Sequence, residues 1–221
     1  MRLVIVAATG GIGRELLEQS VAAGHDVTAV VRDPSRLSRS ASSVAVDLAH
    51  PDPDALKTAV SESDAVLSGL GPRSKSDTGV ASTGTTAIVD AMQATGTRRL
   101  VVVSAAPIGT VPSPAHPQPP RHDPGDGFFM RHVFAPLTKR AFRSQYCDLA
   151  AMEDVVRDSG LDWTIVRPPR LTDKRRTGRY RTAYGHNLRR GFLISRADVA
   201  DLMLRVINDP ESIHQVVGVA N

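Results

Sequence analysis

Short apolar runs alternate with amphipathic segments along most of the chain. Leu3 to Val6 is continuously apolar, which is typical of a parallel strand buried on both faces. Glycines follow this run, and apolar residues then recur at helical spacing until Gly24, a typical helix stop. The same alternation predicts strands at residues 3–6, 27–31, 44–46, 65–67, 100–103, 163–166 and 216–220. It predicts helices at residues 12–23, 53–60, 80–94, 145–158 and 197–207.

Repeated strand–helix units of this size indicate a parallel, doubly wound sheet of the Rossmann type. We expect about six or seven strands with helices on both faces, because crossovers between parallel strands are right-handed. Neither an internal repeat nor a linker interrupts the pattern. Residues 1–221 are therefore expected to form a single α/β domain.

A proline-rich stretch breaks the pattern at residues 107–127. It holds seven prolines and three glycines among 21 residues, too many for a helix or a central strand. In a compact domain, a structureless stretch of this length is usually a lid, a binding loop or a disordered segment. Residues 128–143 again look helical, with an interruption expected at Pro136.

Composition narrows the class of protein without naming a ligand. Hydrophobic residues make up 41% of the 221 residues and charged residues 23%, as in ordinary globular proteins. No run approaches the roughly 20 apolar residues of a membrane helix, and the N-terminus lacks the pattern of a signal peptide. The single cysteine, Cys147, excludes an internal disulfide. We therefore expect a cytoplasmic protein without a membrane partner.

The chain carries a formal net charge of +4, and nearly all of its basic residues are arginines. Arginine presents a planar fork that suits phosphate and carboxylate groups. The charge alone is compatible with nucleic acid, with an anionic cofactor, or with compositional bias. Residues 174–181 form a basic stretch that could bind nucleic acid. A solvated loop near an anionic ligand is the more ordinary interpretation of this stretch.

A glycine loop between the first strand and the first helix carries the clearest chemical signal. Thr9, Gly10, Gly11, Ile12 and Gly13 occupy this turn. Glycines there let the backbone approach a pyrophosphate, and the helix N-terminus offers free N–H groups and a partial positive charge. The first glycine of the usual G-x-x-G-x-x-G spacing is Ala7 here, which fits if its φ is negative.

The end of the second strand favours NADP(H) over NAD(H). NAD-binding proteins usually place an acidic residue there, which accepts hydrogen bonds from the ribose hydroxyls. This chain has Arg32 at that point and Arg36 one turn later, and two guanidiniums can bind a 2′-phosphate. Asp33 is the competing ribose ligand, although Pro34 indicates that the chain is already turning away.

Short motifs from the glycine loop to the last helix carry a family resemblance. They lie at residues 8–13, 31–37, 46–48, 69–73, 159–164, 167–169, 177–180 and 194–200. On these motifs nearly the whole chain resembles the atypical short-chain dehydrogenases/reductases, an NAD(P)H-binding group related to NmrA. Within that group it is most similar to the biliverdin-IXβ reductases, also called flavin reductases.

The resemblance implies a role for each matching position. The glycine loop would hold the pyrophosphate, and Arg32 and Arg36 the 2′-phosphate. Asp47 and Leu48 would meet the adenine, and Ser104, Ala105 and Pro168 would lie beside the nicotinamide. The resemblance also implies that Leu70, Gly71 and Arg73 lie along the cofactor.

Conventional short-chain dehydrogenases use a tyrosine with a lysine four residues later, and no tyrosine of this chain has that lysine. By the resemblance, the serine of the biliverdin and flavin reductases falls on Ala105, next to Ser104, and their histidine falls on Arg170. We expect Ser104 either to donate a hydrogen bond to a substrate carbonyl or to be satisfied by backbone. Arg170 could bind an acidic or carbonyl substrate, but a guanidinium is no general acid at neutral pH. Asp148 is either a polar contact in the cleft or a surface or capping carboxylate.

Two functions fit these observations. The first is an NADPH-dependent reductase that transfers hydride to a flavin, a quinone or a similar conjugated acceptor, a reaction in which positioning does most of the catalysis. The second is a non-catalytic NADP(H) sensor of the NmrA-like type, which the missing dyad fits equally well. We expect no metal, and a monomer or a small homo-oligomer.

Overall fold

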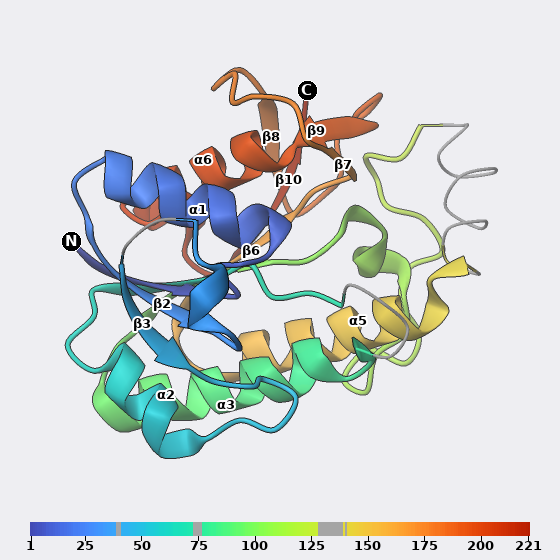
Figure 1. Ribbon diagram of the computed structural model, residues 1–221. Helices are drawn as coiled ribbons and strands as arrows, with labels where there is room; N and C mark the ends of the chain where they lie inside the picture. The colour runs from blue at the N-terminus through green and yellow to red at the C-terminus, as the bar shows by residue number, and fades with distance from the viewer. Residues whose placement is uncertain (39–40, 73–76, 128–138, 140) are drawn as a thin grey trace.

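An eight-stranded sheet runs through the centre of the fold (Figure 1). The computed structural model describes residues 1–38, 41–72, 77–127, 139 and 141–221. The strands stand in the order β3-β2-β1-β4-β5-β6-β10-β8, and all pair in parallel except β8, which is antiparallel to β10. Their bounds are β1 Arg2–Val6, β2 Asp26–Val31, β3 Ser42–Ala45, β4 Ala65–Ser68, β5 Arg99–Val103, β6 Asp162–Arg167, β8 Arg181–Tyr184 and β10 Gln215–Ala220.

The predicted doubly wound sheet is confirmed, with one strand more than expected. The additional strand is β8, a short polar segment without the apolar run that marks the other strands. A second, two-stranded sheet pairs β7 (Arg170–Thr172) with β9 (Leu193–Ser195), and it also was not predicted. These short strands acquire their conformation from their neighbours rather than from local sequence.

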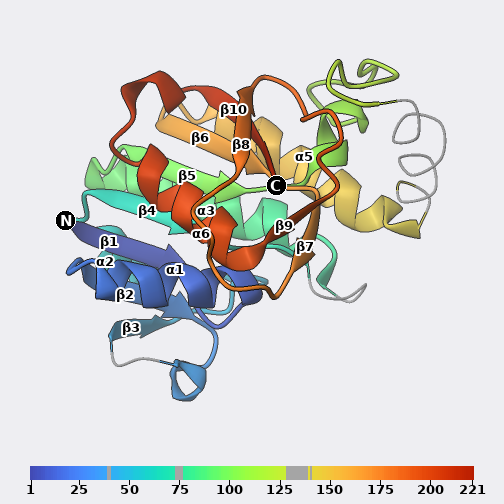
Figure 2. The same ribbon diagram turned by 90° about the horizontal axis from the view of Figure 1, so that it is seen from above.

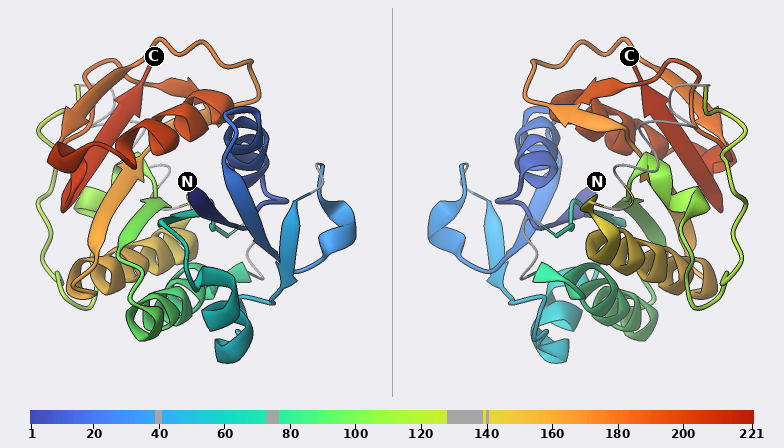
Figure 3. Two further views of the ribbon diagram at one scale, coloured as in Figure 1. Left: turned by 90° about the vertical axis from the view of Figure 1, so that its left-hand side faces the viewer. Right: turned by 90° about the vertical axis from the view of Figure 1, so that its right-hand side faces the viewer.

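Helices cover both faces of the sheet, as predicted. Helices α1 and α6 lie on one face and α2, α3 and α5 on the other (Figures 1 and 3). Each lies within two residues of its predicted range, whereas most of the helix predicted at residues 128–143 falls outside the described residues. The bounds are α1 Gly11–Ala22, α2 Pro53–Val60, α3 Val80–Thr95, α5 Arg143–Asp158 and α6 Arg196–Val206.

Alternation along the strands divides the core into two layers. Leu3 and Ile5 of β1 pack with α1 and α6, whereas Val4 and Val6 of the same strand pack with α2, α3 and α5. Successive strand side chains point to opposite faces, so a strand buried on both sides is continuously apolar. This burial holds the sheet rigid and fixes where the carboxyl ends of the strands lie.

The proline-rich stretch runs beside the carboxyl ends of β5 and β6 (Figure 2). It is not wholly structureless, because a 3-10 helix spans Ala106–Thr110 at its start. Its other end is tied down by Asp123, whose carboxylate accepts hydrogen bonds from the backbone of Gly125 and of Asn187, each at 2.8 Å. Within the described residues, no helix has the length and apolar character to cross a membrane.

Candidate functional site

A cavity of about 480 Å³ opens at the carboxyl ends of the central strands. It lies where the strand order reverses, between β1 and β4, and it extends to β2 and to β5. Ligands of doubly wound sheets bind at such a point, because the two adjoining loops diverge there. Eleven of the predicted site residues line this cavity: Thr9, Gly10, Gly11, Ile12, Arg32, Arg36, Asp47, Leu48, Leu70, Gly71 and Ser104.

The glycine loop brings the N-terminus of α1 to the cavity. Gly10 is the N-cap residue, and no side chain caps the helix there. The first backbone N–H groups of α1 are therefore suited to an anion. Gly13 does not line the cavity. A Cβ at this position would collide with the carbonyl oxygen of Ala7, so Gly13 allows α1 to pack closely against β1.

The expectation of a negative φ at Ala7 is wrong. Ala7 has φ +58°, the left-handed region in which glycine is normally found. Its carbonyl oxygen accepts a hydrogen bond of 2.7 Å from the backbone of Gly10, and its own N–H donates to Val30 at 2.9 Å. These two bonds hold the turn in spite of the unfavourable conformation.

Arg196, which was not predicted from the sequence, places a cation beside the glycine loop. It is the first residue of α6, it lines the cavity, and its guanidinium lies so close to Gly11 that a Cβ there would be 2.6 Å from Nε. Asp173 pairs with Arg196 at 2.6 Å. The signal was weak, because Arg196 is about 180 positions from the loop it meets and belongs to none of the glycine motifs.

Arg32 and Arg36 follow β2 and line one end of the cavity with exposed side chains. Asp33, between them, accepts hydrogen bonds from the backbone N–H of Ser35 at 3.0 Å and from its hydroxyl at 2.6 Å. These hydrogen bonds, assisted by the two arginines, lower the pKa of Asp33. The carboxylate of Asp33 caps the short helix Pro34–Arg36, while the guanidiniums of Arg32 and Arg36 offer donors to the cavity.

The loops after β3 and β4 form the floor beside these arginines. Leu48 and Leu70 are buried and pack against Gly84 of α3, where a Cβ would lie 2.8 Å from the Leu70 side chain. Asp47 accepts a hydrogen bond from the backbone of Ala49 at 3.2 Å. This bond, followed by that of His50, lowers the pKa of Asp47. Arg73, also predicted here, lies outside the described residues.

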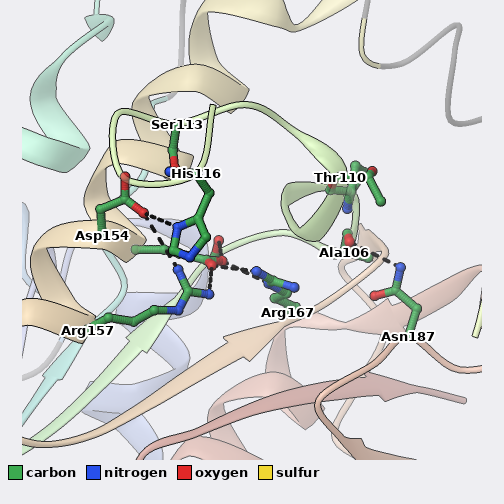
Figure 4. Close-up of polar contacts among 11 residues, drawn as sticks. Ala106, Thr110, Ser113, His116, Asp154, Arg157, Arg167 and Asn187 are labelled. Atoms are coloured by element: carbon green, nitrogen blue, oxygen red, sulfur yellow. Dashed lines mark hydrogen bonds and ion pairs between the residues drawn. The ribbon is translucent and has the colours of Figure 1, made fainter. Parts of the chain in front are cut away.

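At the other end of the cavity, Ser104 follows β5 and contacts a buried carboxylate. Its hydroxyl donates to Oε1 of Glu153 at 2.7 Å. Glu153, 1% exposed, also accepts from Arg167 through Nε at 2.8 Å and Nη2 at 2.5 Å, and from Arg157 at 2.6 Å. Figure 4 shows the two arginine side chains converging on this point. Ser104 is thus satisfied by a carboxylate, not by backbone.

The same part of α5 also holds the proline-rich stretch. Asp154 accepts a hydrogen bond of 2.9 Å from the backbone of Ala115 and lies 3.4 Å from the His116 ring (Figure 4). A smaller cavity, of about 220 Å³, lies between the proline-rich stretch and α5. Arg157, Arg167 and Glu153 line this smaller cavity. Ser104, which is hydrogen-bonded to Glu153, lines the large one, so these connected side chains border both cavities.

An apolar, partly aromatic wall stands across from the strand ends. Phe142, the N-cap residue of α5, and Tyr146, on its first turn, line the large cavity with ring centroids 6.0 Å apart. Leu149 on the same helix face and Leu171 of β7 complete the wall. Sequence reasoning examined Tyr146 only as a catalytic dyad member and did not place it or Leu171 beside a ligand.

A family model described as NAD(P)H-binding matches residues 7–210. The chain belongs to this family. Among curated proteins, a UPF0659 protein of Schizosaccharomyces pombe is 32% identical over 139 residues, which are 61% of this chain and only 51% of that protein. The matched part of this chain thus spans about half the length of the curated relative.

Solved structures of other proteins share the NAD(P)H-binding fold over the whole chain. An anaerobilin reductase of Escherichia coli O157:H7 is 21% identical with a TM-score of 0.76, covering 100% of this chain and 97% of that one. A Streptococcus pneumoniae TIGR4 protein described as a putative NADH-flavin reductase is 23% identical, with a TM-score of 0.74 and coverage of 100% of this chain and 99% of that one. A Veillonella parvula DSM 2008 short-chain dehydrogenase/reductase in complex with NADP is 17% identical, with a TM-score of 0.75 and coverage of 100% and 94%.

Besides Gly13, three predicted site residues of this NAD(P)H-binding chain lie apart from the cavity lining: Ala105, Pro168 and Arg170. Ala105 and Pro168 belong to the two turns after β5 and β6, which are joined by a hydrogen bond of 2.9 Å from Ala106 to Pro168. Arg170 is exposed at the start of β7. The structure therefore brings Ser104 to the cavity but does not place Arg170 beside it.

Asp148 is not a contact of the cleft. It is buried on α5, and its carboxylate accepts hydrogen bonds from the backbone of Ala81 at 3.1 Å and of Ser82 at 3.0 Å. The hydroxyl of Ser82 donates to it as well, at 2.6 Å. Asp148 therefore caps the N-terminus of the neighbouring helix α3, which agrees with the capping alternative.

Proposed function

We propose that the protein is an NADPH-dependent reductase that transfers hydride to a flavin, a quinone or a similar conjugated acceptor. The observation that carries this proposal is one cavity in which a dinucleotide-binding loop, two exposed arginines and an apolar aromatic wall meet. The first two features suit a phosphorylated dinucleotide. The third suits a flat, apolar ring system.

The residues present fit the cofactor at both of its charged groups. The uncapped N-terminus of α1 would bind the pyrophosphate, with Arg196 supplying a second positive charge beside Gly11. Arg32 and Arg36 would bind the 2′-phosphate, because both line the cavity with exposed guanidiniums, which suit a phosphate. When bound, the cofactor supplies the hydride. The chain's own residues bind and orient it at the carboxyl ends of the strands.

The acceptor class follows from the groups that line the other end of the cavity. The hydroxyl of Ser104 donates its hydrogen bond to Glu153, and Tyr146 has Ala150 where the dyad would need a lysine. Reduction of a ketone requires a proton at the carbonyl oxygen, whereas a flavin or a quinone takes hydride into an electron-poor ring and obtains its proton from water. This site therefore favours the conjugated acceptor.

The test measures the oxidation of NADPH with a panel of acceptors. The reaction is monitored by the near-ultraviolet absorbance of NADPH. FMN, riboflavin, menadione and dichlorophenolindophenol would be compared, with NADH and heat-denatured protein as controls. Turnover well above both controls is expected for at least one acceptor. NADPH that binds tightly in calorimetry without turnover would contradict the reductase and favour the non-catalytic sensor, whose site needs no proton donor either.

A further inference from the structure

Ser104 stands at the boundary between the large cavity and the buried ion cluster. It is 8% exposed and lines the cavity, while its hydroxyl contacts Oε1 of Glu153 at 2.7 Å. A serine hydroxyl has one proton to donate and lone pairs that accept. Whether Ser104 can donate a hydrogen bond to a ligand, or only accept one, therefore depends on which group accepts the hydrogen bond of its hydroxyl.

Glu153 accepts the hydrogen bond of the Ser104 hydroxyl because its carboxyl group is ionised. Burial would raise its pKa, but the guanidiniums of Arg167 and Arg157 together outweigh burial and hold the pKa below its ordinary value. An ionised carboxylate only accepts hydrogen bonds. All four contacts to Glu153 come from donors: two nitrogens of Arg167, one of Arg157, and the hydroxyl of Ser104. The lone pairs of Ser104 are then the part of its hydroxyl left for the cavity.

We propose that Ser104 accepts a hydrogen bond from the carboxamide N–H of the nicotinamide ring, and that Glu153 is the positioning residue that fixes this polarity. The inference rests on the proposed function. With the 2′-phosphate at Arg32 and the pyrophosphate at α1, the remaining end of the dinucleotide extends toward β5, where Ser104 lies. A carboxamide carries both an acceptor and donors, and Ser104 selects the donors. The sequence led us to expect that Ser104 donates a hydrogen bond to a substrate carbonyl. In this proposal its hydroxyl instead accepts a hydrogen bond from the carboxamide.

The test compares two dinucleotides that differ only in this group. NADP⁺ carries the carboxamide, and its 3-acetylpyridine analogue carries an acetyl group, which accepts hydrogen bonds but donates none. Dissociation constants for both are measured by calorimetry on the intact protein and on the Ser104→Ala variant. The preference for NADP⁺ over the analogue is expected to fall by about fivefold in Ser104→Ala, the effect of one neutral hydrogen bond. An unchanged preference would overturn the inference.

Three further comparisons separate polarity from folding and from general binding. Ser20→Ala removes a buried hydroxyl of α1 that has no partner within the described residues, and it should leave the preference unchanged. Glu153→Gln presents an amide N–H to Ser104, which frees the serine proton for the cavity, so the preference for NADP⁺ should fall. If Glu153→Gln does not fold, Ser104→Ala still decides. Wild-type protein that binds neither dinucleotide would overturn the proposed function itself.

Discussion

Ala7 adopts a backbone conformation that alanine ordinarily avoids, and the reason lies in its contacts. The turn after β1 must reverse within a few residues, so that Gly10 can donate to the Ala7 carbonyl and α1 can begin. A left-handed alanine costs about 1–2 kcal/mol more than the right-handed form. Surrounding hydrogen bonds and the burial of β1 outweigh this cost.

Substituting Ala7→Gly should therefore stabilise the protein. Glycine removes the left-handed penalty but loses about 0.5–1 kcal/mol of backbone entropy, which leaves a gain of about 0.5–1 kcal/mol. The free energy of unfolding would be measured by urea denaturation. Ala8→Gly is the matched control, because Ala8 is buried beside it without a positive φ, and this change should destabilise. A destabilised Ala7→Gly variant would contradict the strain argument.

Arg32 and Asp33 are neighbours with opposite charges, and their contacts assign them different roles. Asp33 holds the short helix that follows β2, while Arg32 lines the cavity. The order of charged residues in the sequence does not show whether Asp33 is a ribose ligand or a helix cap. The hydrogen bonds to Ser35 support the cap.

Arg32→Asp should weaken NADPH binding by tenfold or more, roughly 1.4 kcal/mol. A carboxylate at this point repels a 2′-phosphate, which NADH lacks, so the affinity for NADH should not fall. Both dissociation constants would be measured on the same variant by calorimetry, which makes NADH the internal control. Equal losses for the two cofactors would indicate damage to the fold rather than to a 2′-phosphate site.

Helix α3 begins without a capping side chain of its own. Its N-cap residue, Gly79, has φ +92° and makes no side-chain cap. Asp148 supplies the cap from α5, more than sixty residues away in sequence. A negative charge at a helix N-terminus is also favoured by the helix dipole. One carboxylate thus joins two helices of the same layer and helps to hold the aromatic wall of α5 in place.

Asp148→Ala should destabilise the protein by about 1–2 kcal/mol, because two backbone N–H groups and a hydroxyl lose their acceptor. Asp158→Ala, on the exposed end of the same helix, is the matched control and should change stability by less than about 0.5 kcal/mol. Urea denaturation of both variants checks this. Equal small effects would show that water replaces the cap.

At the level of the entire fold, Glu153 joins three elements that the sequence separates. It lies on α5 and binds Ser104 after β5 and Arg167 at the end of β6. Its pKa lies below the ordinary value of 4.5, because the two guanidiniums outweigh burial. A lowered carboxyl pKa contributes stability above the unfolded-state value, and this stability is lost as the pH falls through the folded-state value.

Glu153→Gln should lose several kcal/mol at neutral pH, since it leaves Arg167 buried without its counter-charge, for which about 3–5 kcal/mol is typical. The difference from wild type should shrink as the pH falls from the unfolded-state pKa of about 4.5 through the lower folded-state pKa, where the wild-type carboxylate also loses its charge. Free energies of unfolding across this range measure the difference. A difference independent of pH would contradict an ionised Glu153.

The principal strands and helices, and the glycine loop between β1 and α1, could be predicted from sequence. Apolar periodicity is a local property, and a strand buried on both faces or a one-sided helix shows it directly. The cavity's position follows from the same pattern, because the loops after parallel strands gather at one edge of the sheet. Arg32, Arg36 and Asp47 reach the cavity for this reason.

Only the tertiary structure decided what the polar side chains do. Asp148 caps another helix, Arg196 meets Gly11, and the hydroxyl of Ser104 donates a hydrogen bond to Glu153. Each of these contacts joins residues at least 49 positions apart, and no periodicity records them. The short strands β7, β8 and β9 likewise form only because a neighbouring strand accepts their hydrogen bonds. The direction of a hydrogen bond in the cavity depends on burial and on charges brought together from distant segments, which the fold alone assembles.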